Sequence, residues 1–242
     1  MPDFPGAVGL SALRAYPWPT ADDEHGGSPH MHLTCTEGYV VTAGRGRLQT
    51  LNAEGPRTHT LEPGDVVWFT PGTIHRAVND EDLRVTVVMQ NSGLPEAGDA
   101  VLTFPPDHLT PDAYPRAVSL LDGTGRPSPE RARARRDLAV AGFTELVRQW
   151  ESGNTQALHD FCRDAARLVA PRLGEWTEVV RQGPLAAARR TLEQIDALRA
   201  GEIDHLLDAE SARIARPAEE TLGMCGHLRA YDPIRRAGPS GE

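Results

Sequence analysis

Alternating strand and turn signals dominate the first part of the chain. Short segments rich in Val, Thr, Leu and aromatic residues are separated by turn signals at Gly44, Pro63-Gly64 and Pro71-Gly72. Val, Thr and aromatic side chains favour strands, whereas Gly and Pro favour the turns between them. Closely spaced strands of this kind indicate an all-β sandwich or barrel rather than alternating strands and helices. We therefore predict a mainly β fold, a β-barrel, over about residues 8–105.

The hydrophobic pattern changes from strand to helix near residue 128. Ser128 followed by Pro129 is typical of an N-cap and the first position of a helix. Apolar residues then recur three and four positions apart, on one face of a helix, at Phe143, Leu146, Val147 and Trp150. Similar stripes follow, so we predict helical structure from about 128 to 230. The predicted domains are a barrel at 1–107, a proline-rich connection at 108–127 and a helical region at 128–242.

The predicted helices are short, and this limits what they can do alone. Isolated helices of this length are marginal in water. We therefore expect the helical region to pack on the barrel or on a second subunit instead of forming a free domain. Its apolar stripes are interpreted as packing surfaces and not as a cofactor site.

Composition and charge narrow the class of partner. The 242 residues carry a net charge of −9, which makes nucleic acid and anionic membrane surfaces poor partners. All 25 basic residues are Arg, so catalysis through a lysine Schiff base is excluded. The three cysteines are scattered and predict no disulfide framework. The N-terminus lacks the pattern of a signal peptide, and no apolar stretch is long enough to span a membrane, so we expect a cytoplasmic protein.

Candidate chemistry lies in the segment GGSPHMHLTCTEGYVV. His30 and His32 are two positions apart, and on a strand their side chains point to the same face. If that face is buried, the imidazoles need a polar partner, and a metal ion is the obvious one. A second Pro-Gly turn reverses the chain before His75 and returns it alongside this pair, with Glu37 nearby. Three imidazoles and one carboxylate suit Fe(II), Mn(II), Zn(II), Ni(II) or Cu(II).

The two segments resemble the paired motifs of the cupin superfamily. The first motif has His-x-His, then Glu after three or four residues and Gly after six more, and the matching residues are His30, His32, Glu37 and Gly44. The second has Gly, five residues, Pro-x-Gly, two residues, His, three residues and Asn, and the matching residues are Gly64, Gly72, His75 and Asn79. Two turn positions depart from the pattern: Thr70 replaces the Pro of the second motif, and Glu24 replaces the first Gly of the first motif.

The resemblance covers Gly27 to Gln90 and implies a fold and a metal, but no single reaction. It implies a cupin barrel, that is, a double-stranded β-helix or jelly roll, with His30, His32, Glu37 and His75 as ligands of one divalent transition metal ion. It also implies a homodimer, which is a common cupin arrangement. The superfamily includes dioxygenases, isomerases, decarboxylases, seed-storage proteins and sensors. The helical region is not part of the family pattern.

Three functions are compatible with these residues. The favoured one is a mononuclear non-haem Fe(II) dioxygenase or oxygenase acting on a small polar molecule. A metal-dependent isomerase or epimerase of a carbohydrate or hydroxy acid is the second, but it needs a base beyond the ligands, and the sequence identifies no such catalytic residue. The third is a non-catalytic sensor of a small molecule or metal. The candidate pocket-lining residues are Tyr39, Gln49, Trp68 and Gln90.

Overall fold

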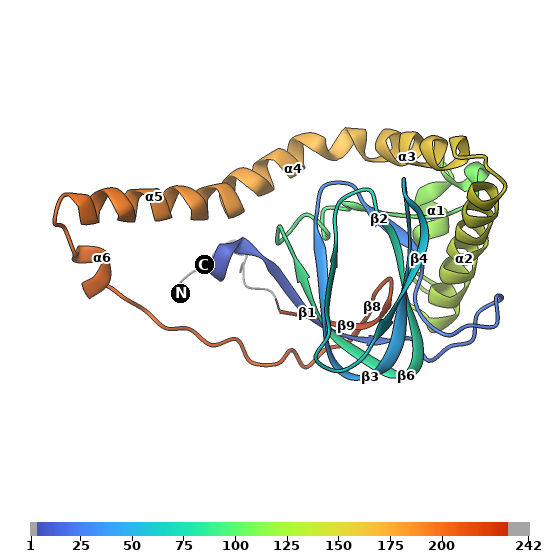
Figure 1. Ribbon diagram of the computed structural model, residues 1–242, viewed down its shortest axis with the longest axis horizontal. Coiled ribbons are helices and arrows are strands. Elements are labelled where there is room, and N and C mark those ends of the chain that lie inside the picture. Colours follow the sequence, from blue (N-terminus) through green and yellow to red (C-terminus); the bar gives the residue numbers. More distant parts are fainter. Residues whose placement is uncertain (1–3, 232–242) are drawn as a thin grey trace.

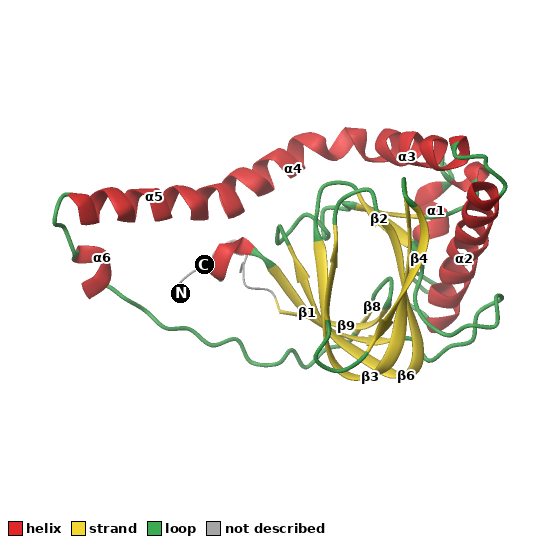
Figure 2. Ribbon diagram, viewed as in Figure 1, coloured by secondary structure: helices red, strands yellow, loops and turns green. Residues whose placement is uncertain are grey.

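The computed structural model describes residues 4–231, and within this range nine strands form one antiparallel sheet that closes into a barrel (Figures 1 and 2). The strands are β1 (Gly9–Ala15), β2 (His30–His32), β3 (Glu37–Asn52), β4 (Gly55–Leu61), β5 (Val66–Phe69), β6 (Ile74–Met89), β7 (Ala100–Leu102), β8 (Thr221–Leu222) and β9 (Gly226–Tyr231). Along the sheet the order is β4-β3-β6-β1-β9-β8, with β2 between β6 and β7, and β5 paired with β3. The predicted order, a barrel followed by helices, is confirmed.

Two long strands form the backbone of the barrel. β3 and β6 run antiparallel from the pair Glu37–Met89 to the pair Leu51–Ile74. The register shifts between Val41 and Gly46, where the ladder is irregular and both strands bend. Gly44 lies in this bend with φ +71°, and a Cβ there would be 2.2 Å from the carbonyl oxygen of Asp82. Only glycine fits this position, so the bend that closes the barrel depends on it.

The first two long helices lie against the barrel. They are α2 (Pro129–Glu151) and α3 (Gln156–Val169), and the hydroxyl of Ser128 caps α2 by accepting from the Arg131 N–H at 3.1 Å. Phe143 on α2 and Phe161 on α3 are buried in the same hydrophobic core as the inner face of the barrel. In the structure these two helices pack on the barrel.

The later helices leave the barrel as an extended arm (Figure 1). The arm consists of α4 (Leu173–Val180), a π-helical turn (Arg181–Leu185), α5 (Ala186–Arg199) and α6 (Asp204–Leu207). Trp176 anchors its base, where the indole N–H donates to the carbonyl oxygen of Ala97 at 3.0 Å. Pro184 has no N–H to donate, and the helix passes it with a π turn. Neither α5 nor α6 buries a residue.

Shorter helical segments connect these elements. They are a 3₁₀ turn at Pro5–Ala7, another at Pro106–His108, α1 (Tyr114–Val118) and a third 3₁₀ turn at Ala170–Arg172. The proline-rich connection is therefore partly helical, because Tyr114-Pro115 places a proline in the first turn of α1, where it is tolerated. Among the described residues, no helix combines the length and the apolar composition needed to cross a membrane.

The end of the helical region differs from the prediction. Helix was expected to about residue 230, but α6 ends at Leu207, and β8 and β9 return to the barrel. β9 extends the sheet by pairing with β1, from Leu10–Tyr231 to Ala15–Gly226. This pairing joins residues more than two hundred positions apart, so no local pattern could reveal it. The residues beyond Tyr231 lie outside the described part of the chain.

Candidate metal centre

Four side chains predicted as ligands meet inside the barrel. β2 pairs with β6 so that His30 lies directly opposite His75. His32 is on the same face of β2, and Glu37 begins β3 beside it. All four are buried, and their ligand atoms lie within 4.8 Å of one another. The three imidazole rings are stacked or tilted against one another, with centroids 4.2–5.7 Å apart.

Backbone carbonyls fix the tautomer of two of the histidines. Nδ1 of His30 lies 2.9 Å from the carbonyl oxygen of Ser28, and Nδ1 of His75 lies 3.2 Å from that of Thr73. A carbonyl can only accept, so Nδ1 must carry the proton and Nε2 keeps its lone pair. Both Nε2 atoms are therefore prepared as ligand atoms.

A buried carboxylate does the same for the third histidine. Nδ1 of His32 lies 3.2 Å from Oδ2 of Asp99, which is fully buried just before β7. Asp99 also accepts from the backbone N–H groups of Thr34 and Cys35 at 2.9 and 3.1 Å. It thus fixes both the ring of His32 and the turn that leads to Glu37. Asp99 was not among the predicted site residues, because it belongs to neither motif and lies far from His32 in the chain.

Two of the candidate ligand atoms, one on Glu37 and one on His75, lack hydrogen-bond partners. Nε2 of His32 and Nε2 of His75 each lie 3.1 Å from Oε2 of Glu37. The alignment does not make a hydrogen bond between His75 and Glu37, and both of these atoms are buried without a partner. Unpaired buried polar atoms cost free energy, and a metal ion at the point where they converge would remove that cost. The residues present therefore fit a divalent transition metal ion held by three nitrogens and one oxygen.

Two histidines of the cluster, His30 and His32, have pKa values shifted in opposite directions. Burial and the neighbouring His75 hold the pKa of His30 well below its usual range. Burial also opposes protonation of His32, but the neighbouring carboxylates of Asp99 and Glu37 outweigh it and raise the pKa of His32 to about 9. Burial alone would raise the pKa of Glu37, yet His75 and His32 hold it well below the usual range. Glu37 is therefore an ionised ligand, and the proton on His32 must leave when a metal binds.

Comparison with known proteins identifies the fold family. The family model described as a cupin domain matches residues 21–89, which include all four candidate ligands. Residues 21–89 belong to the cupin superfamily. No curated protein matches the chain.

Solved structures similar to this cupin overlap with it only in part. An uncharacterized Klebsiella pneumoniae protein with a double-stranded beta-helix domain is 18% identical over 37% of this chain and 69% of its own length, with a TM-score of 0.28. A structure titled for the DMSP lyases RdDddP and RnDddQII is 24% identical over 39% and 40% of the two chains, with a TM-score of 0.27. The TDP-fucose-3,4-ketoisomerase WlaRA of Campylobacter jejuni is 9% identical over 37% and 64%, with a TM-score of 0.30. The last two alignments cover less than two thirds of those proteins, and none of the three establishes a shared activity.

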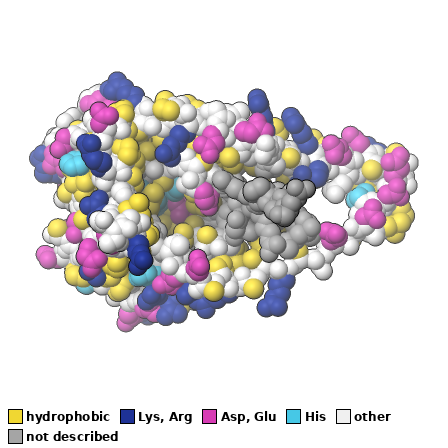
Figure 3. Space-filling view, turned by 180° about the vertical axis from the view of Figure 1, so that it is seen from behind, with side chains coloured by type: hydrophobic (Ala, Val, Ile, Leu, Met, Phe, Trp, Pro, Cys, Tyr) yellow, Lys and Arg dark blue, Asp and Glu magenta, His cyan; other side chains and the backbone are white. Residues whose placement is uncertain are grey.

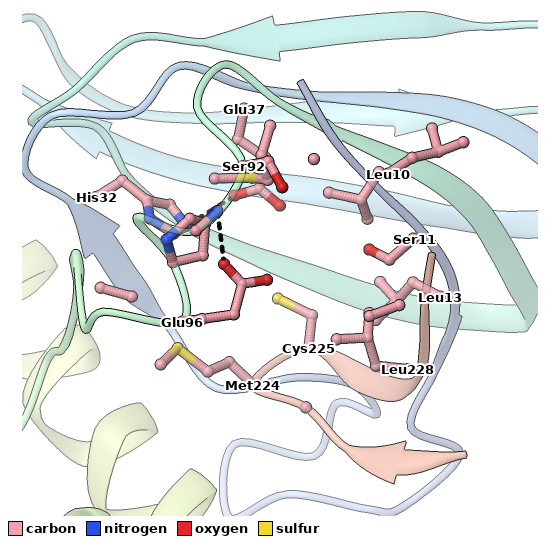
Figure 4. Close-up of a pocket in the computed structure, with 18 of the residues that line it drawn as sticks. Leu10, Ser11, Leu13, His32, Glu37, Ser92, Glu96, Met224, Cys225 and Leu228 are labelled. Carbon is pink, nitrogen blue, oxygen red and sulfur yellow. Dashed lines mark hydrogen bonds and ion pairs between the residues drawn. The ribbon is translucent and has the colours of Figure 1, made fainter. Parts of the chain in front are cut away.

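A pocket of about 800 Å³ in this cupin opens onto the cluster (Figure 4). His30, His32 and Glu37 form part of its wall, and most of the other lining side chains are apolar. The pocket is built from four parts of the chain: the barrel with the loop after β6, α2, the base of the arm and the returning segment of β8 and β9. The returning segment packs closely, since a Cβ on Gly27 would lie 2.4 Å from Cα of Cys225. The volume is in the range of small-molecule sites.

One of the four predicted pocket-lining residues lies in this pocket. Tyr39 lines it, and its hydroxyl lies 3.7 Å from Sγ of Cys225. Trp68 is 71% exposed, because Phe69 faces inward opposite Glu37 and strand alternation turns Trp68 outward. The other two also lie outside the pocket.

The positions of Gln49 and Gln90 have similar causes. Thr50 is the cross-strand partner of the ligand His75, so its neighbour Gln49 faces the other side of β3, where it accepts from Arg76 at 3.5 Å. Gln90 follows the last residue of β6, is exposed and accepts from the Thr36 N–H at 3.1 Å. Strand alternation alone does not say which face of β3 is inside the barrel.

Proposed function

We propose that this cupin is a mononuclear metal-dependent oxygenase that acts on a small molecule. His30, His32, Glu37 and His75 would hold one divalent ion, with Fe(II) favoured over Mn(II), Zn(II) and Ni(II). The observation that carries the proposal is the convergence of four buried candidate ligand residues at one wall of a largely apolar pocket, with Oε2 of Glu37 and Nε2 of His75 lacking hydrogen-bond partners. Such a pocket can admit a substrate next to the ion while limiting water.

The residues around the ion would hold the ligand side chains and orient them toward it. The carbonyl groups of Ser28 and Thr73 and the carboxylate of Asp99 keep the three imidazoles in the ligating tautomer. Glu37 contributes a negative charge. When bound, Fe(II) supplies Lewis-acid and redox chemistry at the coordination positions that the four protein ligands leave free.

The absence of a suitable base among the described lining residues favours an oxygenase over an isomerase. An isomerase must move a proton with a side chain other than the ligands. Burial raises the pKa of Tyr39 well above its usual range and that of Cys225 to about 12, so both are protonated at neutral pH. Glu96 is the remaining carboxylate on the wall, and it is exposed and accepts from the Gly93 N–H at 3.0 Å.

The test is oxygen consumption by protein that has been stripped of metal and reloaded with Fe(II) without air. We expect oxygen uptake to depend on both Fe(II) and a small organic acid from a panel of carboxylic and hydroxy acids, and His75→Ala to abolish it. Turnover of the panel without oxygen, lost in Glu96→Gln, would instead support the isomerase. Binding of a compound without any turnover would support the sensor.

We also propose that the protein is a homodimer. Large apolar side chains are exposed along α5 and α6 and on the turn between them: Leu192, Ile195, Leu198, Ile203, Leu206 and Leu207. The end of the arm is visible in Figure 3. Burying such a surface against a second copy would remove it from water. Analytical ultracentrifugation should show a dimer for the wild type and a monomer for the double variant Leu192→Gln/Leu198→Gln. A monomeric wild type at tens of micromolar would contradict the proposal.

A further inference from the structure

Arg135 is a buried cation on the wall of the same pocket. It lies on α2, outside the matched cupin region, and is 7% exposed. One of its Nη atoms donates to the carbonyl oxygen of Gly223 at 2.6 Å, and its Nε is buried without a partner. No carboxylate of the described residues forms an ion pair with it. Most of its donor capacity is thus unused by the protein.

Other buried arginines of this chain are neutralised by carboxylates. Arg76 is fully buried and forms an ion pair with Asp22. Arg136, the next residue after Arg135, lies 2.8 Å from Asp137 and also donates to two backbone carbonyls. Burial of an unpaired charge is costly, and proteins normally pair such a group. Arg135 is the exception among these three.

The groups around Arg135 do not supply a negative charge. Tyr16, Tyr114 and Cys225 are close enough to act on it electrostatically. Burial raises the pKa of Tyr16 above its usual range and the pKa values of Tyr114 and Cys225 to about 12, so all three are neutral at pH 7. The guanidinium therefore faces a cavity with its charge uncompensated.

We propose that Arg135 binds the carboxylate of a small monoanionic molecule whose apolar body fills the pocket. The inference rests on the proposed function in taking this molecule as the substrate presented to the metal centre. A planar guanidinium matches a carboxylate with two parallel hydrogen bonds. We assign the ligand a single negative charge because of the charged residues in the pocket wall. Arg135 is the one Arg among the described lining residues, and Glu37 and Glu96 would repel a dianion. The apolar body follows from the neighbouring side chains, which include Leu10, Leu13, Met224 and Leu228 (Figure 4).

A second depression, of about 410 Å³, also touches Arg135 and provides a matched control. It is lined by Arg131 and Arg116 but not by the four candidate metal ligands. Arg131 donates to the carbonyl oxygens of Arg116 and Ser119. An anion bound on that side would depend on Arg131.

The experiment measures the affinity of metal-free, full-length protein for octanoate and 4-phenylbutyrate, and for their neutral amides, by calorimetry. Metal is removed by dialysis against a chelator so that no carboxylate can bind through an ion. We expect each acid to bind at least about tenfold more tightly than its amide. Arg135→Met should abolish this preference, and Arg131→Met should leave it unchanged. Arg135→Lys can still donate to Gly223 but lacks the fork, so it should keep the fold, shown by circular dichroism, and lose most of the preference.

Several outcomes would overturn the proposal. They are equal affinities of acid and amide in the wild type, a preference that survives in folded Arg135→Met or Arg135→Lys, and a preference that is lost in Arg131→Met alone. Metal binding by the four ligands without any acid preference would overturn this inference and leave the proposed function standing. An acid preference in a protein that binds no metal would overturn the proposed function and leave the binding of a carboxylate by Arg135 standing.

Discussion

The α2–α3 pair and the α5–α6 arm carry the same kind of apolar stripe, but the stripe is buried on the first and exposed on the second. On α2 and α3, the stripe residues Phe143 and Phe161 are buried against the barrel. On α5, Leu192, Ile195 and Leu198 recur every three positions and are 61%, 39% and 50% exposed. Periodicity therefore predicts which face of a helix is apolar, but the rest of the fold decides what covers that face.

The difference also separates a rigid part of the molecule from one with little support. The metal centre is surrounded by paired strands and by buried acceptors such as Asp99. Few contacts hold the arm beyond Trp176, so its helices should open locally at a low free energy. The chemistry is thus placed where the structure has least freedom to move.

The largest expected contrast is between the histidines of the centre and those outside it. His32→Ala should reduce the metal content from about one ion per chain to near zero, because it removes one of the four ligands and leaves Glu37 in an incomplete site. His59→Ala, His108→Ala and His159→Ala should retain full metal content. Elemental analysis of the four variants after loading with Zn(II) measures this. Equal content in wild type and His32→Ala would disprove the site.

The next contrast is in stability. Phe143→Ala should lower the free energy of unfolding by about 3–5 kcal/mol, since it leaves a cavity between α2 and the barrel. Leu198→Ala on the arm should change it by about 0.5 kcal/mol or less, because none of the described residues buries that side chain. Urea denaturation, at a dilution where ultracentrifugation shows monomer, compares the two. Similar losses in both variants would mean that the arm packs on its own barrel.

The sequence carried enough information for the barrel and the ligands because both are local patterns. Strand alternation places His30 and His32 on one face, and the turn at Pro71-Gly72 returns His75 beside them. Trp68 and Gln49 were wrongly expected in the pocket, because alternation defines two faces without saying which one is inside.

Residues whose role depends on distant contacts could not be predicted. Asp99 meets His32 across 67 positions, and Arg135 meets Gly223 across 88. β9 pairs with a strand at the other end of the chain. In each case the partner is chosen by the folded barrel, and a single sequence without its relatives does not record that choice.

A smaller effect should come from the residue that holds His32. Asp99→Asn should weaken metal affinity by about 10- to 100-fold, because the amide is a poorer acceptor for the Nδ1 proton and no longer supports the imidazole with a charge. Asp82→Asn, at an exposed position of β6 beside Arg84, is the matched control and should have no effect. Competition with a chromogenic Zn(II) chelator measures both. An unchanged affinity in folded Asp99→Asn would show that Asp99 supports only the turn at Thr34 and Cys35.

The smallest effect is the pH dependence of stability and of metal affinity. We expect it to arise from His32 in the interior of the barrel and not from the rest of the chain. The pKa of His32 is raised to about 9 in the metal-free protein, so its protonated form stabilises the fold. That contribution is fully present below about pH 6.5, the value of a free histidine, and is lost as the pH rises through about 9. Metal affinity should change in the opposite direction, rising by up to about tenfold per pH unit across this window, because one proton must leave His32 before the ion binds.

Two titrations at pH 6.5, 7.5 and 8.5 test this pair of slopes. Urea denaturation of the metal-free protein should show stability falling with pH in the wild type but not in His32→Ala, which lacks the titrating group. Zn(II) competition in the wild type should show affinity rising over the same range. His30 does not obscure the result, since burial lowers its pKa and its contribution is lost only as the pH falls below the window. The same fall in stability in His32→Ala would place the pH response outside the metal centre.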